Sequence, residues 1–357
     1  MPQERPNDLF QELSEKLGNL LRPHEKSGTD SLADDPDNPV VLPGDAGNDG
    51  NNDGDAAAAP SPEDRAESER VAREVSKNVD TSGEEEALED EGPRPLPILA
   101  RLRARGLFED DWRARPTADR PYPVVCVHGT GTTKGDWMEL GHDLREDGYA
   151  VFAPDFGNRA TDTIAESASQ IGAYIDTVLQ VTGAEQVILI GHSQGGTLCR
   201  YWMRLLGGAP KVRHLVSLAV PNHGTTLGGI VSPLVRTSMA ENIMNSLVSS
   251  WFGDSGFEQV AGHATIAAIN EGGDLDPGVT YTCIATRGDT VIQPPETCFL
   301  YPDKAELADG TVDELETDRV HNIWVQDLHP RAVILHADLP QDERVRRIIR
   351  DELAMVE

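Results

Sequence analysis

Short apolar runs alternate with amphipathic segments from Pro97 to the end of the chain. An apolar run of about four to eight residues is typical of a buried strand, whereas apolar residues three and four apart indicate a helix. The alternation predicts βαβ units around a mainly parallel sheet. The predicted strands are residues 123–129, 149–157, 186–191, 212–221, 279–286 and 321–327, and the clearest helices are 137–146, 161–183 and 341–355.

The chain before Pro97 differs in composition and has few apolar runs. Leucines and Phe10 recur at helical spacing over residues 7–22, which predicts one short amphipathic helix. Residues 27–93 consist mainly of Asp, Glu, Gly, Asn, Ser and Ala, with too little apolar surface to offset the entropy of ordering. We therefore expect an acidic, largely disordered extension over residues 1–97 and one globular domain over 98–357.

The net charge of −30 limits the choice of partners. Residues 1–99 alone contain 25 acidic and 9 basic side chains. Such a chain repels phosphate backbones, and no run rich in Lys and Arg offers an exception, so nucleic acid is not an expected partner. No window has the roughly 18 apolar residues of a transmembrane helix, and the first 30 residues lack the apolar stretch of a signal peptide.

The segment GHSQG at residues 191–195 carries the main chemical signal. It matches G-x-S-x-G and lies between an apolar strand and a predicted helix, where a sharp turn exposes the serine hydroxyl. Gly191 and Gly195 leave room for the turn, and the helix N-terminus favours a developing negative charge at Ser193. A tight turn that merely needs glycines is the alternative, but the strand and helix on either side favour Ser193 as a nucleophile.

Together with VCVHGTGTT at residues 125–133, this motif resembles the bacterial triacylglycerol lipase and esterase group of α/β-hydrolases. The VCVHGTGTT segment is similar to the fungal lipase B type. The resemblance runs from about Pro121 to the C-terminus and omits the acidic extension. It implies an α/β-hydrolase fold with a helical cap, carboxylic ester hydrolysis without a cofactor, and an acylglycerol or other ester as substrate.

Ester hydrolysis requires donors for the oxyanion of the tetrahedral intermediate. One is expected to be the backbone N–H of Gln194, the residue after the nucleophile, and another to come from the loop after the first strand, residues 128–132. By resemblance, Thr130 supplies its N–H there and its hydroxyl as a third donor. A phosphate-binding loop at GTGTTKG is excluded because no Gly-Lys-Ser/Thr follows.

In this fold the acid follows the nucleophile and precedes the histidine. Asp289 follows the strand at 279–286, where a carboxylate can reach an imidazole, and the resemblance points to the same residue. Asp276 precedes that strand and is the weaker alternative.

Three of the ten histidines follow Asp289 in the sequence. His336 lies before the last helix, where the resemblance places the base, and His329 is the alternative. His321 opens the last strand and is expected to point into the core. The others near the motifs or strands are expected to be structural, namely His128, His192 and His214.

Residues 222–273 lose the α/β regularity and are apolar and rich in small side chains. A cap over the active site, acting as a lid, fits this composition. Ordinary core packing explains the same residues equally well.

Metal binding and disulfide formation have weak support in the sequence. There is no HExxH and no Cys/His cluster with ligand spacing, so no metal is expected. A group of acids suits calcium, although a solvated loop explains it better: Asp303, Glu306, Asp309 and Asp313. Cys126 and Cys199 are expected to be buried free thiols, and pairing of Cys283 with Cys298 is left open.

Two other functions remain beside a lipase acting on acylglycerols at a lipid interface. One is an esterase for short-chain esters or polyesters without interfacial preference, and the other is a non-catalytic binding protein that retains the hydrolase fold. Relatives of this type are commonly secreted, whereas this N-terminus shows no signal, so secretion and the cytoplasm both stay open. The sequence does not predict the oligomeric state.

Overall fold

The computed structural model describes residues 97–101, 103–226, 248, 252–302 and 318–356. The predicted helix at residues 7–22 and the acidic extension lie outside these residues. So does part of the expected cap, at 227–247 and 249–251. The acids suggested for calcium also lie outside them, namely Asp303, Glu306, Asp309 and Asp313.

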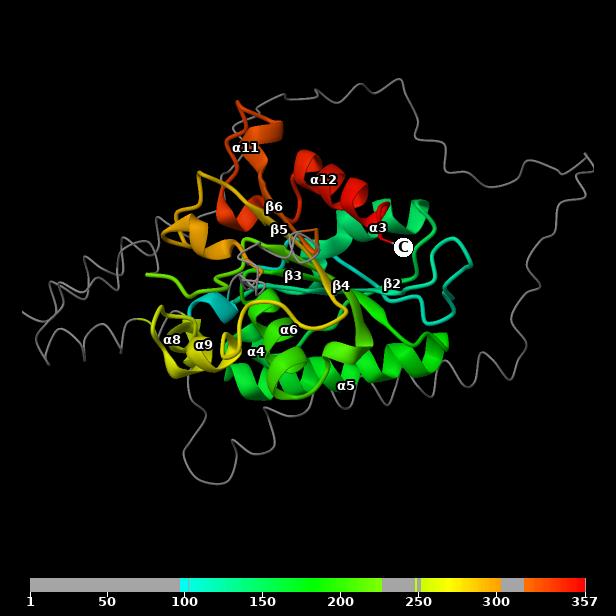
Figure 1. The fold of residues 1–357 in the computed structure, drawn as a ribbon, viewed down its shortest axis with the longest axis horizontal. Coiled ribbons are helices and arrows are strands. Elements are labelled where there is room, and N and C mark those ends of the chain that lie inside the picture. The colour runs from blue at the N-terminus through cyan, green and yellow to red at the C-terminus, as the bar shows by residue number, and fades with distance from the viewer. Residues whose placement is uncertain (1–96, 102, 227–247, 249–251, 303–317, 357) are drawn as a thin grey trace, which may run out of the picture.

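A parallel sheet of six strands forms the centre of the molecule (Figure 1), in the order β2-β1-β3-β4-β5-β6. This arrangement confirms the prediction of a mainly parallel sheet. The strands are β1 Val124–Val127, β2 Val151–Phe152, β3 Val187–His192, β4 Val212–Leu218, β5 Thr280–Ala285 and β6 Val320–Trp324.

Helices cover both faces of the sheet (Figure 1). Helices α3 (Met138–Glu146) and α12 (Glu343–Leu353) lie on one face, and α5 (Ile164–Thr182) and α6 (Gln194–Leu205) lie on the other. Successive residues of a strand face opposite sides, so β1 contributes Val124 and Cys126 to one apolar core and Val125 and Val127 to the other. Strands β1 to β5 are buried on both faces, apart from two intermediate positions, which explains their largely apolar sequences. This layered arrangement agrees with the α/β fold predicted from the sequence.

Short helical turns connect these elements. These short helices and turns are η2 Leu99–Arg101, η3 Lys134–Trp137, α4 Gly157–Ala160, η4 Ala209–Lys211, α8 Asp254–Glu258, α9 Ala264–Ile269, η5 Pro295–Cys298, α11 Val325–Leu328 and η6 His336–Asp338.

The longest described helix, α5, has 19 residues. Neither it nor any other helix that the structure describes has an apolar stretch long enough to span a membrane.

The turn α4 is left-handed. Its residues Gly157, Asn158, Arg159 and Ala160 have φ angles of 54°, 48°, 62° and 58°. Non-glycine residues seldom adopt this conformation because Cβ crowds the following carbonyl. The Arg159 carbonyl accepts a hydrogen bond from the Gly131 N–H at 2.8 Å. The left-handed turn therefore supports the loop that follows β1.

Several predicted boundaries shift. The strand predicted at 149–157 is only two residues long, because the Ala153 N–H donates to the Asp110 carboxylate instead of a neighbouring strand. The strand predicted at 321–327 ends at Trp324, and α11 begins at the next residue, Val325. The helix predicted at 161–183 is confirmed within a few residues, with Gly183 as its left-handed cap at a φ of 71°.

The prediction that His321 points into the core was wrong. Its side chain is 50% exposed, and its Nδ1 lies 2.8 Å from Glu352 Oε2 of α12. Strand β6 forms the edge of the sheet, so its side chains are less enclosed than those of the central strands. An edge position cannot be read from the sequence of a single strand.

All four cysteines are free and buried. Cys283 and Cys298, whose pairing was left open, therefore do not form a disulfide. Burial raises the pKa of the Cys283 thiol to about 12 and that of Cys126 further. These thiols are neutral at ordinary pH and act as small apolar side chains.

Candidate active site

Ser193 lies in a sharp turn between β3 and α6. Its φ of 53° and ψ of −126° are strained for a residue with a side chain. The Ser193 N–H donates to the Leu218 carbonyl at 2.9 Å, which ties the turn to the end of β4. The neighbouring strand therefore helps to hold this strained conformation in place.

Two glycines allow the turn to pack closely. A Cβ on Gly191 would lie 2.4 Å from Gly196 Cα, and a Cβ on Gly195 would lie 2.1 Å from the Val127 carbonyl oxygen. Both obstacles are backbone atoms and cannot rotate away. The close approach of α6 to β1 therefore requires glycine at position 195.

His336 contacts both Ser193 and Asp289. Its Nε2 lies 2.9 Å from Ser193 Oγ, and its Nδ1 lies 2.8 Å from Asp289 Oδ2. With the proton on Nδ1, the ring donates to the carboxylate and accepts from the serine hydroxyl. The structure thus brings together the three side chains that the sequence suggested, from positions separated by 143 and 47 residues.

The backbone fixes the Asp289 carboxylate. Its Oδ1 accepts hydrogen bonds from the N–H groups of Val291 and Ile292, both at 2.8 Å, and Oδ2 remains for His336. The side chain is fully buried, so the ionised group depends on these donors. The alternative acid, Asp276, instead accepts the Tyr281 hydroxyl at 2.8 Å.

The loop after β1 lies against the nucleophile turn. A Cβ on Gly129 would lie 3.2 Å from Ser193 Cβ. The Thr130 hydroxyl donates to Gln194 Oε1, so its suggested role as a third donor to an oxyanion stays a prediction. Gln194 is the first residue of α6, where N–H groups have no acceptor inside the helix. The assignment of the backbone N–H groups of Thr130 and Gln194 as donors to an oxyanion near Ser193 therefore stays a prediction.

His192, expected from the sequence to be structural, supports His336 through a contact that no sequence motif indicates. Its Nε2 donates to the His336 carbonyl at 3.1 Å, and the two rings lie with centroids 5.0 Å apart. Burial lowers the pKa of His192 well below its ordinary value, and the nearby His336 lowers it further. His192 therefore stays neutral and adds no positive charge that would oppose protonation of His336.

His128 is a second buried and neutral imidazole beside the site. Its ring stacks on Phe156 at a centroid distance of 4.3 Å, and burial lowers its pKa. Its Nδ1 lies 3.0 Å from the Gly129 carbonyl oxygen. His128 is therefore part of the packing that supports the loop after β1, as the sequence suggested.

The alternative base was His329. The imidazole that contacts Ser193 is that of His336 and not that of His329.

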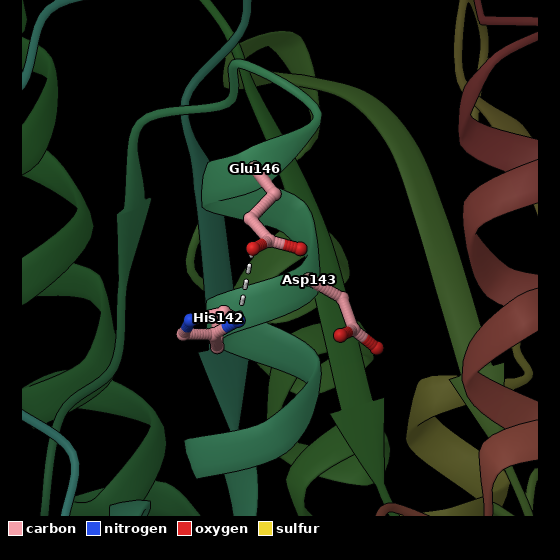
Figure 2. A group of neighbouring side chains, drawn as sticks. All are labelled: His142, Asp143 and Glu146. Carbon is pink, nitrogen blue, oxygen red and sulfur yellow. Dashed lines mark ion pairs between the residues drawn. The ribbon is translucent and has the colours of Figure 1, made fainter.

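One surface group on α3 has donor types that suit a metal. His142, Asp143 and Glu146 lie close together on the exposed side of the helix (Figure 2). His142 Nδ1 is 3.8 Å from Glu146 Oε1, and Asp143 is bonded to Arg346 of α12. Ordinary surface ion pairs account for this group, because Asp143, its least exposed carboxylate, is already paired with Arg346.

A family model described as alpha/beta hydrolase fold matches residues 122–232. This range includes the strand β1, the loop after it, the turn at Ser193 and all of α6. Asp289 and His336 lie beyond the matched range.

Curated relatives and a solved structure give further similarity. The triacylglycerol lipase of Pseudarthrobacter phenanthrenivorans is 28% identical over 231 residues, which cover 54% of this chain and 71% of that protein. The triacylglycerol lipase of Burkholderia plantarii is also 28% identical, over 54% of this chain but only 63% of its own length. Aspergillus fumigatus lipase B aligns with a TM-score of 0.48 and 16% identity, over 66% of this chain and 52% of that one.

Proposed function

Since this chain is an α/β-hydrolase related to bacterial lipases and esterases, we propose that it hydrolyses carboxylic esters with Ser193 as the nucleophile. The observation that carries the proposal is the hydrogen-bonded series from Ser193 through His336 to Asp289. A serine hydroxyl is a weak nucleophile until a base accepts its proton, and a base is effective when an acid orients it.

In the first stage, Ser193 Oγ attacks the ester carbonyl while its proton moves to His336 Nε2. The Asp289 carboxylate holds the Nδ1 proton and stabilises the imidazolium that forms. The tetrahedral intermediate then collapses and breaks the bond to the alkoxy oxygen. His336 Nε2 returns the proton to that oxygen, so the alcohol leaves and the acyl group stays on Ser193.

In the second stage, water replaces the alcohol. His336 Nε2 accepts a proton from the water as its oxygen attacks the acyl carbon. Collapse of the second intermediate releases the carboxylic acid and returns the proton to Ser193 Oγ. The neutral state of His192 supports this step as well, because a second cation beside His336 would disfavour each protonation of its ring.

The oxyanion of each intermediate is assigned to the backbone N–H groups of Thr130 and Gln194. The dipole of α6 adds a favourable potential at the same position, because the helix begins at Gln194. Removing one such donor in a serine hydrolase typically reduces turnover by about 100-fold or more.

For the substrate, we propose an acylglycerol, as in the relatives that are named triacylglycerol lipases. An esterase for short-chain esters is the alternative, and the two differ in their response to a lipid interface. Turnover of an emulsified long-chain triglyceride should be compared with turnover of a dissolved short-chain ester. Preference for the emulsion supports the lipase, and preference for the dissolved ester contradicts it.

Replacement of Ser193 by alanine tests the reaction itself. The variant is expected to lose hydrolysis of a chromogenic ester while its circular dichroism and melting temperature remain close to those of the parent protein. Retained turnover in a folded Ser193→Ala variant would overturn the proposal. Complete inactivity of the parent protein on every ester tried would instead favour the non-catalytic alternative.

A further inference from the structure

One arginine outside the matched hydrolase region joins two loops of the candidate site. Arg105 precedes β1, whereas the family match begins at residue 122. Its Nε lies 3.2 Å from Asp136 Oδ1, and its Nη1 lies 3.2 Å from Asp338 Oδ1. Its Nη2 also donates to the Ala337 carbonyl. Asp136 belongs to the loop region after β1, and Ala337 and Asp338 follow His336.

Asp136 depends on this contact because its side chain is only 2% exposed. A buried carboxylate needs a partner to remain charged, and an arginine fork supplies both charge and directed N–H groups. The backbones interlock at the same place. A Cβ on Gly135 would lie 2.2 Å from the Gly106 oxygen, and a Cβ on Gly106 would lie 2.4 Å from the Gly135 oxygen. The backbone at Gly106 therefore packs directly against the backbone at Gly135 in η3, which follows the loop of Thr130.

The other end of the contact is η6, a 3₁₀ turn of three residues. So short a turn has little stability of its own. Its position therefore depends on bonds to other segments. His192 binds the His336 carbonyl, and Arg105 binds the Ala337 carbonyl and the Asp338 carboxylate. Arg105 thus binds the two residues that follow His336 in the chain, Ala337 and Asp338.

We infer that Arg105 is a positioning residue for the reaction, holding the His336 loop in register with the loop that carries Thr130. The inference rests on the proposed ester hydrolysis. Arg105 has no assigned contact with the substrate and acts through the two loops. A lysine cannot replace it fully, because an ammonium group lacks the planar fork that reaches both loops together.

The test begins with Arg105→Ala in the full-length chain. A misplacement of about 1 Å near the reacting atoms costs on the order of 100-fold in rate. We expect kcat for a soluble chromogenic ester to fall about 10- to 100-fold with little change in KM. The rate of inactivation by a serine-directed phosphonate should fall by a similar factor. Arg105→Lys should recover part of the loss.

Arg350→Ala is the matched control. Arg350 makes two hydrogen bonds to Asp147, at 2.6 and 2.7 Å, between α12 and the end of α3. Its loss removes a partly exposed ion pair of good geometry without touching either active-site loop. We expect a change in melting temperature but an unchanged kcat. An equal fall in kcat for both variants would overturn the inference, as would an unchanged kcat in Arg105→Ala.

Asp338→Ala provides the test if Arg105→Ala does not fold. The Asp338 side chain is 34% exposed, so its removal leaves no buried charge without a partner. Its kcat should fall, by less than in Arg105→Ala, with little change in melting temperature. An unchanged kcat would contradict the inference. Ser193→Ala is assayed in parallel, because retained hydrolysis there means that the proposed function has failed and not the role of Arg105.

Discussion

Replacement of Gly195 by alanine adds one methyl group at the point where α6 approaches β1. The new Cβ would lie 2.1 Å from the Val127 oxygen and 2.5 Å from the His128 oxygen. Real Cβ contacts essentially never fall below 3.0 Å, so the backbone must separate by about 0.9 Å at the closer contact. No side chain can rotate to relieve this contact, because both atoms belong to the backbone of β1 and its loop.

The displacement affects catalysis more than stability. Overpacking of this kind typically costs about 1–3 kcal/mol in the free energy of unfolding. The moved atoms include the N-terminus of α6 and the loop of Thr130, and a shift of about 1 Å there reduces turnover on the order of 100-fold. We therefore expect kcat for a chromogenic ester to fall by about two orders of magnitude in a protein that still folds.

Gly183→Ala is the control for stability. Gly183 ends α5 with a φ of 71°, and a Cβ added there would have no atom of another segment within 4 Å. The left-handed conformation alone costs roughly 1–2 kcal/mol. Both variants should thus show comparable shifts in urea unfolding, while only Gly195→Ala loses turnover. An unchanged kcat in Gly195→Ala would refute the argument from backbone contact.

Three further predictions concern acid–base chemistry and the thiols. Asp289→Asn keeps the size of the side chain but removes the charge that stabilises the imidazolium, so kcat should fall by about 10⁴-fold in steady-state assays. Burial lowers the pKa of His214 from 6.5 to about 3, so its contribution to stability is present above pH 6.5 and is lost as the pH falls toward 3. Urea unfolding of His214→Gln should therefore show a weaker loss of stability than the parent protein between about pH 7 and about pH 4. Without reductant, a thiol reagent should label four cysteines only after denaturation, and fewer than four would contradict the free thiols.

The strands, helices and nucleophile turn could be predicted because local patterns determine them. Continuous apolar runs follow from burial on both faces of a parallel sheet, and G-x-S-x-G between a strand and a helix is a local geometric requirement. Asp289 and His336 were found by their order along the chain and by resemblance. Their contact depends on how β5 and η6 lie in the completed sheet.

Other features depend on contacts that no local pattern records. Arg105 lies 31 residues before Asp136 and 233 before Asp338, and an arginine in a polar segment resembles any exposed one. The exposure of His321 follows from β6 being the edge strand. The left-handed turn at Gly157–Ala160 contains only one glycine, so its sequence lacks the usual marker of positive φ.

Labelling with a serine-directed phosphonate tests the central claim most directly. The full-length protein is treated with the reagent, digested and analysed by mass spectrometry to locate the adduct. We expect a single adduct on the peptide that contains Ser193, formed much more slowly in His336→Ala. An adduct on a different serine, or an equal rate of labelling in His336→Ala, would contradict the account.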